Sequence, residues 1–188
     1  MSSVSEKLRR MGACREAVEW SKKYRSDLAA WKACRRGDHM LWYCGKTAGP
    51  PDSDSRRKLV LVAAECAELA LPFVCDEETR AICEATIQTC YAYVWGGAEL
   101  DDVRSAAAAA ATAATAAYAA AAAAYAATAA TGANPAAAAA DAAADAAAAA
   151  YDADAYADAA AYSAAAARSK ILAACAKIVR ANYPESPL

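Results

Sequence analysis

Hydrophobic positions recur at three- and four-residue spacing along this chain, and that period predicts α-helices rather than strands. The clearest amphipathic stretch is Arg56–Leu71, and the next is Asp76–Trp95, where acidic residues stand at the start and Gly96 at the end. Shorter helices are expected in the first third of the chain: from Ala13, from Ser26 to Gly37, and from Asp38. The pattern therefore predicts an all-α fold.

The pattern changes between residues 106 and 167, where 44 of the 62 residues are alanine. Alanine has the highest intrinsic helix propensity, and the sequence GANP at 132–135 is typical of one helix ending and another beginning. We expect two long helices over 100–131 and 135–183, joined by this short connection as an antiparallel hairpin. Alanine side chains are small, so these helices would be stabilised by close approach.

Together these elements predict a single domain, a helical bundle of about six or seven helices. Residues 1–98 form its short-helix part, and residues 99–183 form the long alanine-rich helical hairpin. Within the hairpin, Asp141, Asp145 and Asp152 share one helix face, which predicts a solvated side. The hairpin is expected either in the core or as an exposed arm.

Charge and hydropathy exclude several classes of partner. The chain carries 20 Lys and Arg against 22 Asp and Glu, a net charge of −2, and no basic stripe of the kind that nucleic-acid binding needs is evident. The uncharged stretch 105–140 contains threonine, glycine, asparagine and proline and has no flanking Lys or Arg cluster, so we expect no membrane span. The first twenty residues contain no apolar signal segment, which favours a cytoplasmic location.

Eight cysteines and one histidine are the residues that would suggest a metal or redox site. The cysteines form no C-x-x-C pair, and His39 stands apart from them in the sequence, whereas structural zinc sites usually show paired ligands. We therefore expect free, buried thiols that act as small hydrophobic side chains, with no metal and no cofactor.

Catalytic chemistry is not predicted. No nucleophile–base pair can be recognised, so we expect a protein that is not an enzyme and has no catalytic residues. Aromatic and charged residues do gather in one stretch and shortly after it, a composition typical of either a core edge with a solvated rim or a contact surface. These candidate contact residues are Trp31, Arg35, Asp38, Trp42, Arg56 and Arg57.

Four segments of the chain resemble the predicted all-α immunity-protein group often called immunity-five-like, which occurs in bacteria and in phage genomes. They are GACREAVEW at 12–20, AWKACRRGDHMLW at 30–42, RRKLVLVAAECAELAL at 56–71 and KIVRANYPESP at 177–187. The resemblance covers most of the chain, with His39 where an aromatic residue is expected. It implies neutralisation of a toxin or a role in bacterial or phage conflict, and it carries no catalytic residues.

Three functions follow as hypotheses. The first is a non-enzymatic immunity or anti-defence factor that occludes a toxin or defence protein. The second is a phage-type protein that sequesters a nucleotide immune signal between helices, with arginines for phosphates and tryptophans for the base. The third is a structural bundle that self-associates into a homodimer or higher homo-oligomer through its alanine and tyrosine face. A pocket lined by arginine and tryptophan would favour sequestration.

Overall fold

The protein is seen in a computed structural model that describes residues 3–51, 53–74, 76–113, 126, 129, 139–140, 142–145 and 157–186. Every regular element among these residues is helical, so the all-α prediction is confirmed. The helices are α1 (Val4–Arg10), α2 (Arg15–Ser21), α3 (Asp27–Ala33), α4 (Gly37–Thr47), α5 (Asp54–Glu68), the 3-10 turn η1 (Leu71–Phe73), α6 (Glu77–Val94), α7 (Leu100–Ala113) and α10 (Ala157–Asn182).

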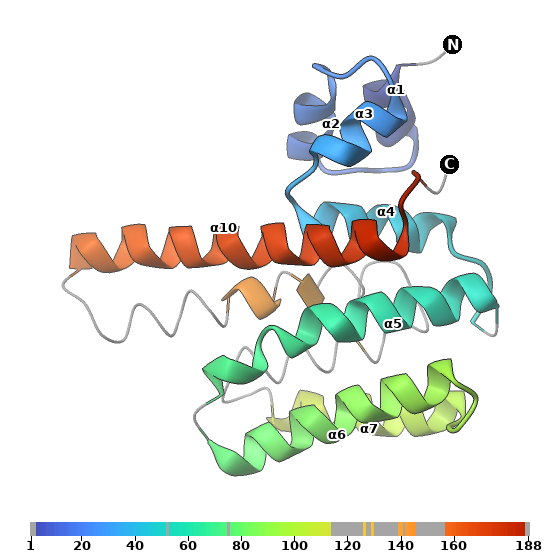
Figure 1. The fold of residues 1–188 in the computed structure, drawn as a ribbon, viewed down its shortest axis with the longest axis vertical. Helices are drawn as coiled ribbons and strands as arrows, with labels where there is room; N and C mark the ends of the chain where they lie inside the picture. The colour runs from blue at the N-terminus through green and yellow to red at the C-terminus, as the bar shows by residue number, and fades with distance from the viewer. Residues whose placement is uncertain are drawn as a thin grey trace.

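The described part of the chain contains eight α-helices, more than the six or seven predicted, because residues 4–10 form a full helix, α1, ahead of the short helices expected from Ala13 onward. Helix α5 runs through the middle of the molecule, with α4 and α10 packed on one side of it and α6 on the other (Figure 1). Helix α7 packs against α6, and α1 to α3 form a separate group beyond α4 (Figure 1).

Side-chain caps begin several helices where the sequence predicts them. The hydroxyl of Ser26 accepts a hydrogen bond from the Ala29 amide at 3.2 Å, and the carboxylate of Asp76 accepts one from the Thr79 amide at 2.7 Å. Such bonds satisfy amides at a helix start that have no partner within the helix. At the other end of α6, Gly96 takes a positive φ of 77°, which glycine adopts without strain.

The prediction at Gly37 is wrong. We expected this glycine to end one helix and Asp38 to cap the next, but α4 begins at Gly37 itself. A Cβ atom there would lie 2.3 Å from the Cβ of Cys175 and 2.9 Å from the backbone nitrogen of Ala176. Gly37 is therefore needed for the close approach of α4 to α10, a requirement set by tertiary packing rather than by the local sequence.

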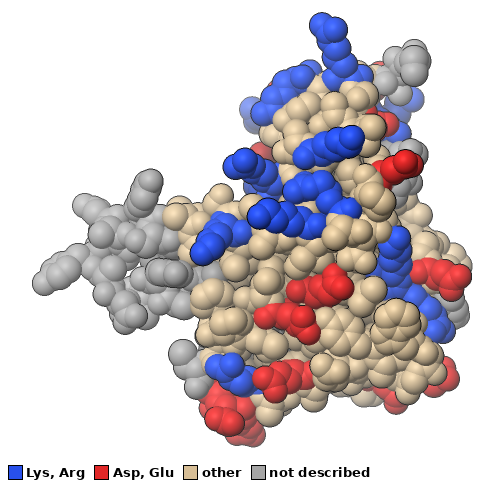
Figure 2. Space-filling model, in the orientation of Figure 1, with Lys and Arg blue, Asp and Glu red and all other residues tan. Residues whose placement is uncertain are grey.

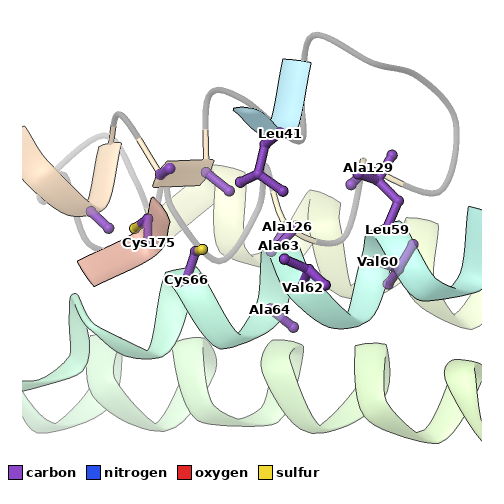
Figure 3. Close-up of a cluster of buried hydrophobic side chains, with 14 of the residues drawn as sticks. Leu41, Leu59, Val60, Val62, Ala63, Ala64, Cys66, Ala126, Ala129 and Cys175 are labelled. Carbon is purple, nitrogen blue, oxygen red and sulfur yellow. The ribbon is translucent and has the colours of Figure 1, made fainter. Parts of the chain in front are cut away.

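The core around α5 consists largely of small side chains. Val62, Ala63 and Cys66 of α5 are fully buried, and they lie beside Ala126 and Cys175 (Figure 3). In this close-up Cys66 of α5 and Cys175 of α10 lie near one another, and a hydrogen bond joins their thiols (Figure 3). Because such side chains are short, their helices can lie close together.

Part of the alanine-rich segment 106–167 contributes to this core, although other described alanines of the segment, such as Ala108 and Ala166, are exposed. Seven alanines of the segment beyond α7 are buried in the monomer: Ala126, Ala129, Ala139, Ala140, Ala142, Ala143 and Ala144. Asp145 was predicted to lie on a solvated face; its side chain is 42% exposed and forms an ion pair with Arg168 of α10 at 3.2 Å. The predicted turn at 132–135 and Asp141 and Asp152 lie outside the described residues.

None of the described helices has both the length and the apolar character that crossing a bilayer requires.

Candidate functional site

A cavity of about 420 Å³ lies between the group α1 to α3 and the facing side of α4. Three tryptophans form part of its wall, one from each of three helices: Trp20 of α2, Trp31 of α3 and Trp42 of α4. Ala17 and Met40 add to its apolar surface. Large rings on short helices cannot interlock as closely as alanines do, and the space between them is left as the cavity.

The tryptophan rings are held from outside the cavity. The indole N–H of Trp31 donates a hydrogen bond to the carbonyl of Tyr183 at 2.9 Å, so the end of α10 fixes a ring on α3. The ring of Tyr43 lies 5.9 Å from that of Trp31. The ammonium of Lys46 stands 5.4 Å above the ring of Trp42, a cation–π distance. The ring of Trp20 lies 4.7 Å from that of Tyr24, so each of the three rings has a neighbouring group that holds it.

The polar groups of the cavity wall are largely paired with each other. Arg36 donates hydrogen bonds to both carboxylate oxygens of Asp38, at 2.9 Å and 2.6 Å, and a third to Glu16 at 2.8 Å. At the other end, Lys7 and Asp27 form an ion pair at 2.9 Å. With two cations and three carboxylates, this set is close to electrical balance before the charge of His39 is counted.

Asp38 is the buried charge of this group, with 8% of its surface exposed. Burial by itself opposes ionisation, but the hydrogen bonds from Arg36 and the nearby charge of His39 outweigh it and lower the pKa of the carboxyl below its ordinary value. The same bond to Asp38 raises the pKa of Arg36. Burial also raises the pKa of Tyr43 to about 12, so its hydroxyl keeps its proton at neutral pH. Asp38 is therefore a carboxylate.

Cys14 and His39 meet on the cavity wall although 25 residues separate them. The thiol sulfur lies 3.7 Å from Nε2 of the imidazole, and the same nitrogen lies 3.8 Å from a carboxylate oxygen of Asp38. The sequence offered no nucleophile–base pair, because Cys14 stands before α2 and His39 lies in α4. Only the docking of α2 against α4 brings the two together.

The structure brings together three of the six candidate contact residues. Trp31, Asp38 and Trp42 all line the cavity, whereas the exposed Arg35 does not. Arg36, its neighbour, takes the place at the cavity that Arg35 was expected to share. Neighbours on a chain point in different directions, and the sequence alone did not distinguish them.

Arg56 and Arg57 are structural rather than part of the cavity. Arg56 is buried and donates hydrogen bonds to the carbonyls of Ala48 and Gly49, at 3.4 Å and 3.0 Å. Arg57 donates to the carbonyl of Tyr93 at 3.0 Å, and its guanidinium lies 5.0 Å from the ring of that tyrosine. Arg56 therefore ties the start of α5 to the connection before it, Arg57 ties α5 to α6, and neither lines the cavity.

Several cavity residues were not predicted as contact residues, chiefly Trp20 and Cys14. The signal that could have found Trp20 is the run Glu16 to Trp20 on one helix, which places an apolar ring and a carboxylate one turn apart. No comparable signal exists for Cys14, which resembles the other cysteines in its sequence context. Its exposure follows from the fold.

Six of the seven described cysteines are buried, as predicted, and all seven are free thiols. Burial raises the pKa of the thiols of Cys34, Cys44, Cys83 and Cys90, to about 12 for Cys44 and Cys90. The hydrogen bond with Cys175 raises that of Cys66, and burial adds to it. Cys14 is the exposed one, and Cys75 lies outside the described residues. In the described part of the chain, no group of three His, Cys, Asp or Glu side chains is arranged to hold a metal ion.

Charge is distributed unevenly around the cavity. Residues 1–58 contain 14 Lys and Arg against 7 Asp and Glu, whereas residues 59–113 contain 2 against 9. On the face shown in Figure 2, basic side chains gather over α1 to α3 and along α10, and acidic ones lie mainly over α5 and α6. The cavity therefore lies in the more basic part of the molecule, although its own wall is nearly balanced.

In comparisons of the chain with protein-family models, with curated protein sequences and with solved structures, nothing matches. Membership of the immunity-five-like family therefore stays a prediction.

Proposed function

We propose that this protein is a non-enzymatic binding protein that sequesters a small aromatic ligand in the cavity between α1 to α3 and α4. The observation that carries the proposal is the cavity wall itself, where three tryptophans line about 420 Å³ of space. Small-molecule sites are usually concave, mostly apolar and supplied with a few polar groups that fix orientation. This cavity has each of those properties.

The volume sets the size of the ligand. A dry apolar cavity of about 150 Å³ is large enough to bind benzene, so a cavity of about 420 Å³ admits a ligand with two or three fused rings. Planar rings can stack on indoles with a gain beyond the burial of their area. The rings of Trp31 and Trp42 are held by neighbouring groups, which reduces the ordering cost of binding.

The charges favour a ligand of low net charge. Lys7 and Arg36 are the cations of the wall, and each is paired with a carboxylate at 2.9 Å or less. A nucleotide with several phosphates would have to displace Asp38 from Arg36, which is unfavourable for a buried carboxylate that would then lose its partner. Sequestration of a nucleotide signal is therefore proposed in a narrower form, as binding of an aromatic base or similar ring.

The resemblance to the immunity-five-like group gives this proposal its context. An immunity or anti-defence factor can act by removing a small signal as well as by occluding a protein. A specific observation also supports a surface for protein occlusion: the indole of Trp95, at the end of α6, is 77% exposed, and exposed aromatic rings often anchor protein interfaces. We keep occlusion of a toxin or defence protein as the second proposal.

Calorimetric titration with 2-naphthol, an uncharged two-ring probe, tests the first proposal on the full chain. We expect binding to the native protein and at least about a tenfold weaker affinity for Ala17→Leu, because a lost cavity contact of 1.4 kcal/mol corresponds to that factor. Ala17 is 8% exposed and lines the cavity, so the longer side chain fills part of it.

Ala29→Leu is the matched control, since Ala29 is exposed on α3 and does not line the cavity. Equal affinity in all three proteins would count against the cavity as the site. Native mass spectrometry on the same samples reads the number of subunits. A dimer that buries Trp95 would support an interaction surface there instead.

A further inference from the structure

The contact between Cys14 and His39 could support a reaction of the thiol, which non-covalent binding of a ligand does not require. The thiol sulfur and Nε2 of the imidazole are 3.7 Å apart, within the distance at which a thiol can share its proton with a base. Both side chains lie on the wall of the cavity, so a ligand held there has access to the sulfur. We propose that Cys14 and His39 form a nucleophile–base pair that attaches a soft electrophilic ligand covalently within the cavity.

The surroundings of His39 favour proton transfer from the thiol. The carboxylate of Asp38 lies 3.8 Å from Nε2, and Arg36 holds that carboxylate through two hydrogen bonds. When the imidazole takes the thiol proton, the thiolate and the carboxylate both lie near the same ring nitrogen, Nε2, and their negative charges stabilise the imidazolium. The geometry thus provides a nucleophile, a base and a group that stabilises the charged base.

The reaction that fits this arrangement is addition to an α,β-unsaturated carbonyl compound with an apolar body. His39 accepts the proton of Cys14, and the thiolate sulfur forms a bond to the β-carbon of the ligand. The electron pair of the carbon–carbon double bond moves toward the carbonyl to give an enolate. The imidazolium then returns the proton to the α-carbon, which leaves a thioether, a neutral imidazole and no leaving group. No oxidant or reductant is required.

Cys14 also differs from the other thiols that the structure describes. Six of those are buried, and burial or a hydrogen bond raises the pKa of five of them, whereas Cys14 is exposed. The thiolate is the reactive form of cysteine, and a buried thiol with a raised pKa is inert. Reagents should therefore distinguish Cys14 from the buried cysteines in the folded protein.

Two maleimides test the inference on the full chain, because both add to a thiol in the same way: N-ethylmaleimide and N-phenylmaleimide. Peptide mapping by mass spectrometry gives the rate at each cysteine. We expect Cys14 to react first, and about tenfold more slowly in His39→Gln, since loss of the base leaves an unassisted thiol. Added free imidazole should restore part of that rate in His39→Ala, a rescue that a merely structural histidine would not show.

Arg35→Gln is the control variant, since it removes a charge that is not on the cavity wall, and its rate should equal that of the native protein. Far-ultraviolet circular dichroism verifies that each variant is folded. Equal rates at Cys14 in the native protein and in His39→Gln would overturn the inference, as would a rate in the native protein below that of the urea-unfolded chain.

The inference rests on the proposed function, because the ligand must bind in the cavity before Cys14 can react with it. The covalent step and the aromatic binding site can nevertheless fail separately. A phenyl-to-ethyl rate ratio at Cys14 above the ratio in the urea-unfolded chain, and lowered to that ratio by Ala17→Leu, would support both. Fast, His39-dependent reaction with the same phenyl-to-ethyl ratio as the unfolded chain would support the nucleophile–base pair and count against the cavity as an aromatic site.

Discussion

Two regions of this molecule pack their helices with side chains of opposite size. The α1 to α4 region is built from large aromatic side chains on short helices, and it contains a cavity of about 420 Å³. The region around α5, α6 and α10 is built from valine, alanine and cysteine side chains, many of them with no exposed surface. Where α10 of the second region meets α4, the two helices approach so closely that Gly37 of α4 has no room for a Cβ atom.

The difference indicates that side-chain size gives the two regions of one chain different roles, one in stability and one in binding. Small side chains leave little free volume between helices, so the α5 region is packed as closely as a crystal of small organic molecules and tolerates little added side-chain volume. Bulky rings that are held at their edges leave space that a ligand can use. We therefore expect the α5 region to determine stability and the α1 to α4 region to determine binding.

The strongest test places the same added volume in each region. Ala63→Leu in α5 should destabilise the fold by about 3 kcal/mol, because overpacking a close-packed core displaces neighbouring side chains and backbone. Ala17→Leu at the cavity should change stability by less than about 1 kcal/mol, since space is available for the new side chain. Both alanines are buried in helices. Urea unfolding measures the difference, and equal losses would break the comparison.

A smaller effect is expected from Gly37→Ala at the contact of α4 with α10. The new Cβ would lie 2.9 Å from the backbone nitrogen of Ala176, and moving backbone costs about 2 kcal/mol. Gly97→Ala is the matched control, because a Cβ there meets its nearest atom at an ordinary 3.5 Å. The urea midpoints of the two variants should therefore separate. If Gly37→Ala unfolded at the native midpoint, close approach of these helices would not be required.

The smallest effect concerns the charges at the cavity. Asp38→Asn should lower stability at pH 7 by about 1 kcal/mol, because Arg36 loses charged hydrogen bonds. The pKa of Asp38 is lowered in the folded state, so its contribution is present above the ordinary carboxyl pKa of about 3.9. It is lost as the pH falls through the lowered value of the folded protein.

The difference between native and Asp38→Asn proteins should therefore shrink as the pH is lowered from about 4, and urea unfolding across that series measures it. Glu19→Gln provides the control. Its exposed ion pair with Lys22 should contribute less than about 0.5 kcal/mol at any pH. A difference for Asp38→Asn that grew on acidification would contradict the lowered pKa.

The features that the sequence could predict are those set by contacts within a few residues of each other along the chain. The starts of α3 and α6 are local, because a serine or aspartate caps amides within three residues. The end of α6 at Gly96 is also local, because a single glycine adopts the positive φ that ends the helix. Most of the apolar face of α5 was visible in its three- and four-residue spacing.

The candidate site was predicted in part. Trp31, Asp38 and Trp42 were recognised as a cluster because α3 and α4 are neighbours in the chain. The burial of Arg56 could not be predicted, since a charged residue after a loop resembles a surface group until its carbonyl partners at Ala48 and Gly49 are known. Burial of an arginine is decided by hydrogen-bond partners.

The amino-acid sequence by itself determined that this chain is helical, where most helices of the first hundred residues begin and end, and that its cysteines are mainly small buried groups. These properties depend on propensity, capping and periodicity, which act within a few residues. Only the tertiary structure decided that Cys14 meets His39, that Gly37 faces Cys175 and that three tryptophans line a cavity. Such contacts depend on how helices dock, and docking follows from shape and volume summed over the whole core.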